Sequence, residues 1–287
     1  MAITIAGSGI VSANIADGTI VAADIADNQN LGIENFVPRG LICSNDSDAS
    51  HDVAISVGGV RDATNTVNMS LAAILTKRID AAWAVGDNNG GLDGTESSGG
   101  TPDASTMYYI WLIKRSDTGV VDALYSESAT GPTLPTNYDY KRLIGAVYTN
   151  GSANITAFVN RGMNFMYTAS PIVDINDTSL TGDTEETGTL SVPPSSIAWV
   201  YAQGSNTGSS QTLGRFLLYN ADQTLATGVG NSWLAIGTAG TFDHATTAGQ
   251  ITVNASSQVK YEQNEDSGTA SIIVSTYGFT MLTRNDP

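Results

Sequence analysis

Isoleucine recurs at every fifth position near the start of the chain, inside two near-repeats of ten residues. The four residues that set this spacing are Ile10, Ile15, Ile20 and Ile25. The spacing fits neither the period of an amphipathic helix nor the alternation of a strand. No aromatic residue precedes Phe36, so the segment cannot build a core of its own. We therefore expect residues 1–36 to be a docking or assembly segment, whose isoleucines are covered by other copies of the chain or by a partner.

Composition after the repeat favours strands. Charged residues make up only 14% of the chain, whereas Gly, Ser, Thr, Asn and Ala are abundant, which is poor material for long helices. Short apolar runs bounded by turn residues follow one another, and MYYIWLIKR (107–115) is the strongest of them. The fold class predicted is all-β. An extended N-terminal segment would precede two antiparallel β-sandwich, jelly-roll-like units over residues 37–170 and 171–287.

Several segments need individual interpretation. SLAAILTKRIDAAW (70–83) fits a helix face or a strand, and the turn-rich context favours a strand. Residues 86–106 are polar and rich in Gly, Asp and Ser, which predicts a long loop. Residues 176–189 are polar and acidic without apolar periodicity, which predicts a connector. Because the connections between strand candidates are short, we expect no parallel pairing.

The charge of the chain excludes two classes of partner. Twenty-eight acidic and twelve basic residues give a formal net charge of −16, which argues against binding to nucleic acid or to an anionic membrane surface. No apolar run is long enough to span a bilayer, and no secretory leader is visible. The single cysteine, Cys43, rules out an intramolecular disulfide.

Catalytic chemistry finds little support. The chain has only two histidines, His51 and His244, and no G-x-S-x-G motif accompanies them. Cleavage of polysaccharide would need two carboxyl groups across a sugar cleft. Acidic residues that could serve are Asp122, Glu127, Asp139, Glu185, Glu186 and Asp222, and the sequence alone does not pair them. We predict no enzyme activity and no cofactor.

A metal site is the weaker interpretation of the polar loop. Asp87, Asn89, Asp93 and Glu96 offer oxygen ligands, but their spacing misses the EF-hand pattern because Ser98 occupies the twelfth position. An exposed loop without a metal ion is the prediction. Three basic pairs lie in the first unit, at residues 77–78, 114–115 and 141–142. They are interpreted as solvated charges at strand ends or as contacts between subunits.

Glycan recognition is the binding chemistry that the aromatic residues favour, because aromatic rings stack on the apolar faces of sugars. Candidate receptor contacts are Trp233, Tyr261 and Tyr277 in the last unit. Trp199 and Tyr201 are two residues apart and share one face of their strand, and we expect them to fill the sandwich core.

One stretch of the chain resembles a known module. Residues 107–162 combine an aromatic strand, a D-T-G turn and the motifs V-D-x-L-Y-S, P-T-L-P and K-R-x-I-G. This combination is similar to a module found in structural proteins of tailed bacteriophages, especially tail fibres and other virion appendages. The isoleucine-paced segment looks like those by which phage fibres join the particle, and the ending ASIIVSTYGFTML is similar to the way such proteins finish.

The resemblance implies a virion component, a homotrimer that docks to other tail or head proteins by its N-terminal segment and contacts a host surface glycan through its last unit. Three copies around one axis would also cover a single isoleucine row. A head-decoration fibre of the same build, a polysaccharide depolymerase and a carbohydrate-binding module of a bacterial surface protein are the alternatives.

Overall fold

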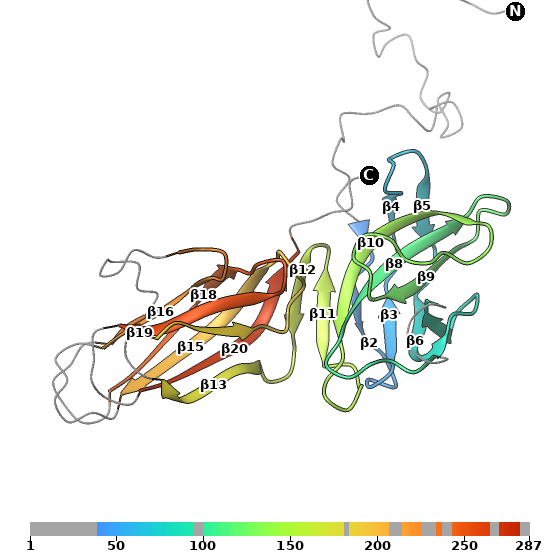
Figure 1. Cartoon of the computed structure of the whole chain (residues 1–287). Helices are drawn as coiled ribbons and strands as arrows, with labels where there is room; N and C mark the ends of the chain where they lie inside the picture. Colours follow the sequence, from blue (N-terminus) through green and yellow to red (C-terminus); the bar gives the residue numbers. More distant parts are fainter. Residues whose placement is uncertain are drawn as a thin grey trace, which may run out of the picture.

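The computed structural model describes residues 39–93, 100–180, 184–206, 214–224, 234–236, 243–264 and 270–281, which fold into two lobes of β-strands (Figure 1). The described residues form twenty strands: β1 (Arg39–Gly40), β2 (Cys43–Asn45), β3 (Asp52–Ile55), β4 (Gly58–Arg61), β5 (Asn68–Leu71), β6 (Leu75–Ala82), β7 (Asn89–Leu92), β8 (Met107–Arg115), β9 (Val121–Ser126), β10 (Tyr138–Tyr148), β11 (Phe158–Arg161), β12 (Asn164–Tyr167), β13 (Ile172–Leu180), β14 (Glu186–Thr189), β15 (Ile197–Asn206), β16 (Gly214–Asn220), β17 (Leu234–Ile236), β18 (Asp243–Thr252), β19 (Gln258–Asn264) and β20 (Ala270–Thr280). The predicted all-β class is confirmed.

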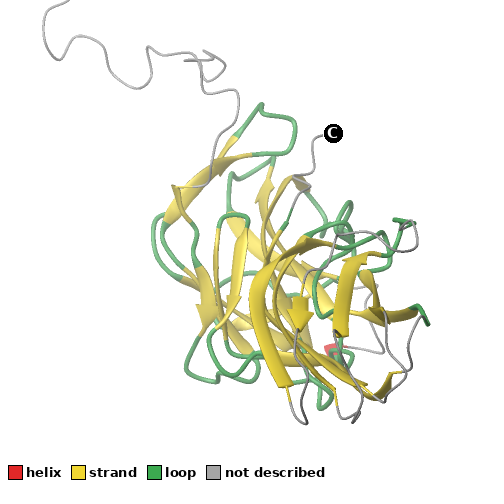
Figure 2. Cartoon of the chain, turned by 90° about the vertical axis from the view of Figure 1, so that its left-hand side faces the viewer, coloured by secondary structure: helices red, strands yellow, loops and turns green. Residues whose placement is uncertain are grey.

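Three sheets contain these strands. The largest has thirteen strands in the order β10-β8-β9-β7-β6-β3-β2-β11-β12-β20-β15-β18, with β13 also paired to β20. In the first lobe, β5 of the small sheet β1-β4-β5 lies against β8 and β9. In the second lobe, β16 and β17 of the sheet β14-β19-β16-β17 lie against β15 and β18. Each lobe is therefore a β-sandwich, and turns at its ends join the strands (Figure 2).

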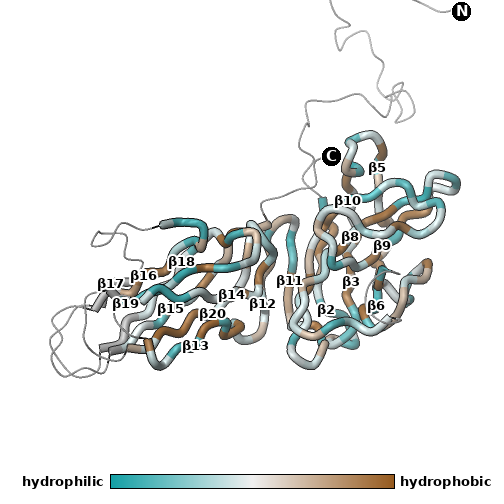
Figure 3. Tube along the Cα trace, in the orientation of Figure 1, coloured by the Kyte–Doolittle hydropathy of each residue, from teal (hydrophilic) through white to brown (hydrophobic). Residues whose placement is uncertain are grey.

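The core of the first lobe is centred on β8. Its residues from Tyr108 to Ile113 are all buried, and Trp111 is fully enclosed. Burial on both faces explains why this strand is a continuous apolar run rather than an alternating one. Hydrophobic residues concentrate on β8, β3 and β20, while the turns are hydrophilic (Figure 3). Enclosing one large aromatic side chain contributes roughly 4–6 kcal/mol of transfer free energy, as an upper bound.

The two lobes share one sheet. Strand β20 pairs with β12 from Gly278 to Thr280 and with β13 from Ala270 to Thr276, so the edge of β20 passes from one lobe to the other. The aromatic rings of Phe158, Phe165 and Phe279, from β11, β12 and β20, stack at centroid distances of 5.1 and 4.5 Å. The boundary predicted near residue 170 falls at the connection between β12 and β13, and the division into two units stays a prediction.

Not every strand pair is antiparallel, contrary to the sequence-based expectation. Strand β7 pairs in parallel with β6, where Lys77 lies opposite Asn89, and also with β9. Only residues 83–88 connect β6 to β7, far fewer than a helical crossover needs. The prediction was wrong because a buried lysine, rather than a helix, satisfies the polar backbone of this connection.

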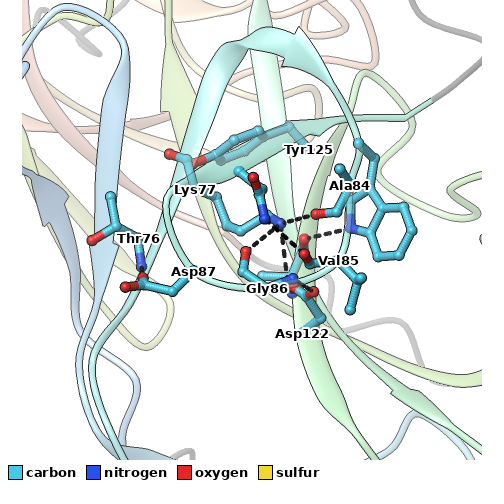
Figure 4. A network of polar contacts seen from close by, with 11 residues as sticks. Thr76, Lys77, Ala84, Val85, Gly86, Asp87, Asp122 and Tyr125 are labelled. Carbon is cyan, nitrogen blue, oxygen red and sulfur yellow. Dashed lines mark hydrogen bonds and ion pairs between the residues drawn. The ribbon is translucent and has the colours of Figure 1, made fainter.

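Lys77 lies inside the loop that follows it (Figure 4). Its ammonium donates hydrogen bonds to the carbonyl oxygens of Ala84 at 2.7 Å and Gly86 at 3.1 Å. It also forms an ion pair with Asp122 on β9, at 3.2 Å, and the two side chains are 0% and 1% exposed. Asp122 in turn accepts a hydrogen bond from the backbone N–H of Gly86 at 2.7 Å. Burial lowers the pKa of Lys77, and the neighbouring Asp122 carboxylate opposes this shift.

The basic pairs therefore do not behave alike. The first lysine of residues 77–78 is a core residue, which corrects the interpretation of that pair as solvated or intersubunit charge. Arg78 and Arg115 form ion pairs with Asp80 and Asp117, at 3.0 and 2.6 Å, near the surface. Arg142 is also buried, so only part of this basic set is solvated.

Three uncertain segments are now resolved. Residues 75–82 form strand β6, which confirms the preference for a strand over a helix. The polar stretch 86–106 contains β7, with Gly90, Gly91 and Leu92 buried, so it is not a loop throughout. Residues 176–189 are not a connector, because β13 and β14 occupy much of the segment. Most of their polar residues face outward, with Asp174 as an exception, while Ile175 and Leu180 pack in the core.

Candidate functional site

The structure separates the predicted receptor contacts. Trp233 and the four isoleucines Ile10, Ile15, Ile20 and Ile25 lie outside the described residues. Tyr261 is only 8% exposed, because β19 turns its ring into the sandwich, where it lies close to Gly188 of β14. Tyr261 is therefore a core residue rather than a surface contact. Tyr277 is partly exposed on the outward face of β20.

Tyr277 has two aromatic neighbours on that face. Its ring centroid lies 4.7 Å from that of Tyr201 and 6.0 Å from that of Trp199, both on β15. Tyr201 is 43% exposed. The expectation that Trp199 and Tyr201 fill the core was wrong, because the small or branched side chains of Ala198, Val200 and Ala202 occupy the inward positions of β15. We call Trp199, Tyr201 and Tyr277 the aromatic face.

A glycine allows the indole ring of Trp199 to lie against the backbone of β20. A Cβ atom at Gly278 would stand 2.6 Å from Cε3 of Trp199 and 2.5 Å from the backbone oxygen of Phe165. The ring of Trp199 thus covers the backbone of β20 at a position where any other residue would displace it. The register shifts between Trp199 and Val200, which leaves Tyr277 between the paired positions Thr276 and Gly278.

On the three strands that carry and flank the aromatic face, no charged side chain is found among the outward positions that the structure describes. The outward positions with described side chains are Ile197, Trp199, Tyr201, Gln203 and Ser205 on β15, Ser271, Ile273, Ser275 and Tyr277 on β20, and Thr246, Ala248, Gln250 and Thr252 on β18. None of these side chains is charged, although the whole chain has a net charge of −16. Aromatic rings bordered by hydroxyl and amide groups suit a neutral ligand rich in hydroxyl groups.

A cleft of about 670 Å³ lies between the two lobes. The first lobe contributes Tyr148 and Thr156 to its wall, and the second contributes Val173, Asp174 and Leu190. Its volume is within the range of small-molecule sites. It forms where the chain passes from β12 to β13. The neighbour of β20 changes at this point, because β12 pairs with residues 278–280 of β20 and β13 pairs with residues 270–276.

Asp174 is the charged group of this cleft. Ser191 Oγ donates a hydrogen bond to Oδ1 at 2.6 Å, and Thr276 Oγ1 donates one to Oδ2 at 2.5 Å. Burial raises the pKa of Asp174, and these two hydrogen bonds oppose the shift. On the other wall, Thr156 Oγ1 is a buried hydroxyl with no hydrogen-bond partner among the described residues. Such groups in native proteins are satisfied by water or a ligand.

The raised pKa of Asp174 predicts how stability depends on pH. Between the ordinary aspartate pKa and the raised value, the folded chain binds more protons than the unfolded chain, so its stability falls as pH rises through this window. In Asp174→Asn, this loss should be absent, and the variant should gain stability relative to the wild type from pH 3 to neutral pH. Urea unfolding across this range measures the difference. A constant difference would contradict the assignment, and Asp80→Asn, at a surface ion pair, is the control.

Two of the catalytic candidates that the structure describes already have partners. Asp122 is committed to its ion pair with Lys77, and His51 pairs with Asp48 at 2.9 Å near the surface. Burial raises the pKa of the Cys43 thiol to about 12, which makes it a poor nucleophile. In the part of the chain that the structure describes, no group of three His, Cys, Asp or Glu side chains could hold a metal ion. Likewise, none of the described segments is a helix long and apolar enough to cross a membrane.

No protein-family model matches this chain, and no curated protein is significantly similar to it.

Proposed function

We propose that the chain is a non-enzymatic structural component of a bacteriophage particle, a homotrimeric tail fibre or appendage that attaches the particle to a host surface. Residues 1–36 would dock it to other virion proteins, and the second lobe would contact a glycan receptor. The similarity of residues 107–162 to phage fibre modules supports the phage origin.

The observation that carries the attachment role is the aromatic face. Uncharged, partly exposed aromatic rings on a sheet offer a surface on which the sugars of a glycan can stack. Because these rings already pack against one another, little side-chain entropy is lost when a glycan binds. A single such surface binds weakly. Three copies in one particle component would raise the apparent affinity by a factor of ~10²–10⁴ through avidity.

The proposal is tested by comparing the full-length chain with one that starts at Val37. We expect the full-length chain to have the molar mass of a trimer in light scattering and to bind host cells. The shorter chain should be a monomer in light scattering and folded by circular dichroism, with cell binding weakened at least about tenfold by the loss of avidity. A trimer in both cases would assign residues 1–36 to docking alone. A monomeric full-length chain, or one that releases oligosaccharides from purified capsule, would overturn the proposal.

A further inference from the structure

The aromatic face and the cleft share a border at Val173 of β13. Tyr201 of β15 is paired with Ser275 of β20, and Ser275 is paired with Val173 of β13, so the three side chains form one row across the sheet. Val173 is 57% exposed and also lines the cleft. A ligand that lies along this row from Tyr201 therefore reaches the rim of the cleft at Val173.

The two parts offer complementary chemistry. The aromatic face supplies flat rings that stack on sugar faces in succession. The cleft supplies a fixed carboxyl group at Asp174 and the hydroxyl of Thr156, which has no hydrogen-bond partner in the described part of the chain, and the ring of Tyr148 also lines it. A few fixed polar groups in a largely apolar wall are typical of a site that orients a small ligand.

The charges define the class of ligand. Among the cleft residues that the structure describes, none is a lysine, arginine or histidine. An anionic sugar would thus meet only the carboxyl group of Asp174, in a chain whose net charge is −16. A neutral sugar, by contrast, can donate its hydroxyl protons to Asp174 and satisfy Thr156 Oγ1.

We infer that the aromatic face and the cleft are one binding site for a neutral oligosaccharide. Its terminal sugar enters the cleft between the lobes, and the following units stack on Tyr277, Tyr201 and Trp199. This inference rests on the proposed receptor-binding function and adds to it the class of glycan, the orientation of the chain and the residues that hold its end.

In the first experiment, the full-length chain is applied to an array that carries neutral glycans and, for comparison, negatively charged sialylated glycans. In the second, calorimetry measures its affinity for the neutral oligosaccharide that binds best and for the terminal monosaccharide of that oligosaccharide. Asp174→Asn and Thr156→Val should each weaken binding of both ligands by about tenfold, because the first replaces an acceptor oxygen with an amide N–H donor and the second removes the hydroxyl. Trp199→Ala should weaken binding of the oligosaccharide by about tenfold and leave the affinity for the monosaccharide unchanged. Ile74→Ala, an exposed apolar residue of the first lobe, is the matched control.

Four results would overturn the inference. One is binding of no neutral glycan at millimolar concentration, and another is a preference for sialylated glycans. The third is an oligosaccharide affinity that depends on Trp199 and not on Asp174 or Thr156, which would leave the aromatic face as the whole site. If Trp199→Ala lowers the molar mass of the trimer, the face is an interface between copies, and the inference also fails. Host-cell binding by the wild type that persists in any of these cases would leave the attachment function standing.

Discussion

Replacing Lys77 with methionine is expected to lower the free energy of unfolding by about 3–5 kcal/mol, the cost of breaking a buried ion pair from one side. Methionine fills much of the same volume, so the loss comes from the charge and the hydrogen bonds rather than from a cavity. The buried carboxylate of Asp122 would lose its counter-charge, and the carbonyls of Ala84 and Gly86 would lose their donor. Urea unfolding followed by tryptophan fluorescence measures the difference.

The matched control is Lys114→Met. Lys114 Nζ donates a hydrogen bond to the carbonyl of Asn68 at the surface, at 2.8 Å, so its loss should cost at most about 1 kcal/mol. The double variant Lys77→Met with Asp122→Leu should recover only part of the lost stability. It removes the unpaired charge but leaves the loop carbonyls and the N–H of Gly86 without partners. If Lys77→Met is as stable as Lys114→Met, the buried network does not hold the connection between β6 and β7.

Replacing Gly278 with alanine should affect both stability and binding. The added Cβ would stand 2.5 Å from the backbone oxygen of Phe165, an atom that can move only if β12 shifts against β20. It would also stand 2.6 Å from Cε3 of Trp199, which would have to leave the sheet surface. Overpacking of this kind typically costs 1–3 kcal/mol. We therefore expect a lower unfolding midpoint together with weaker binding to host cells.

Gly131→Ala separates this effect from the general cost of removing a glycine. Gly131 is exposed, and the nearest atom to a Cβ there is Nζ of Lys141, at 3.7 Å. Its substitution should change stability by no more than about 0.5 kcal/mol. Wild-type stability and cell binding in Gly278→Ala would mean that neither the pairing of β12 with β20 nor the position of Trp199 depends on this glycine.

Much of the fold could be predicted from local patterns. The apolar run at 107–115 matches β8, and GRFLLYN (214–220) matches β16, because β-branched and aromatic residues between turn signals specify strands. Strand β13 could not be found in this way, since its polar residues lie on an exposed edge and its place is set by pairing with β20. The parallel pairing of β7 could not be predicted either, because it depends on the burial of Lys77. Lysine side chains are rarely buried, so the sequence gives no reason to expect this one in the core.

The candidate site was only partly accessible from the sequence. That Trp199 and Tyr201 share one face of the strand follows from their spacing. Whether this face points to the core or to solvent does not follow, because both faces of residues 198–202 carry apolar side chains. Their small inward neighbours, Ala198 and Ala202, were the signal that could have indicated it. The cleft brings Tyr148, Thr156 and Asp174 together from separate strands and turns of both lobes, and no local pattern encodes that meeting.

The position of β20 bears on how the molecule is made. This strand comes last among the described strands, yet it is a central strand of the second lobe and the one joined to the first. Its hydrogen bond from Thr280 to Asn164 spans 116 residues of chain, at 3.0 Å. During synthesis on the ribosome, strands β1–β10 can pair as soon as they emerge, whereas the second sandwich must wait for residue 280. The proposed binding site is thus incomplete in every chain whose synthesis stops before β20 is made.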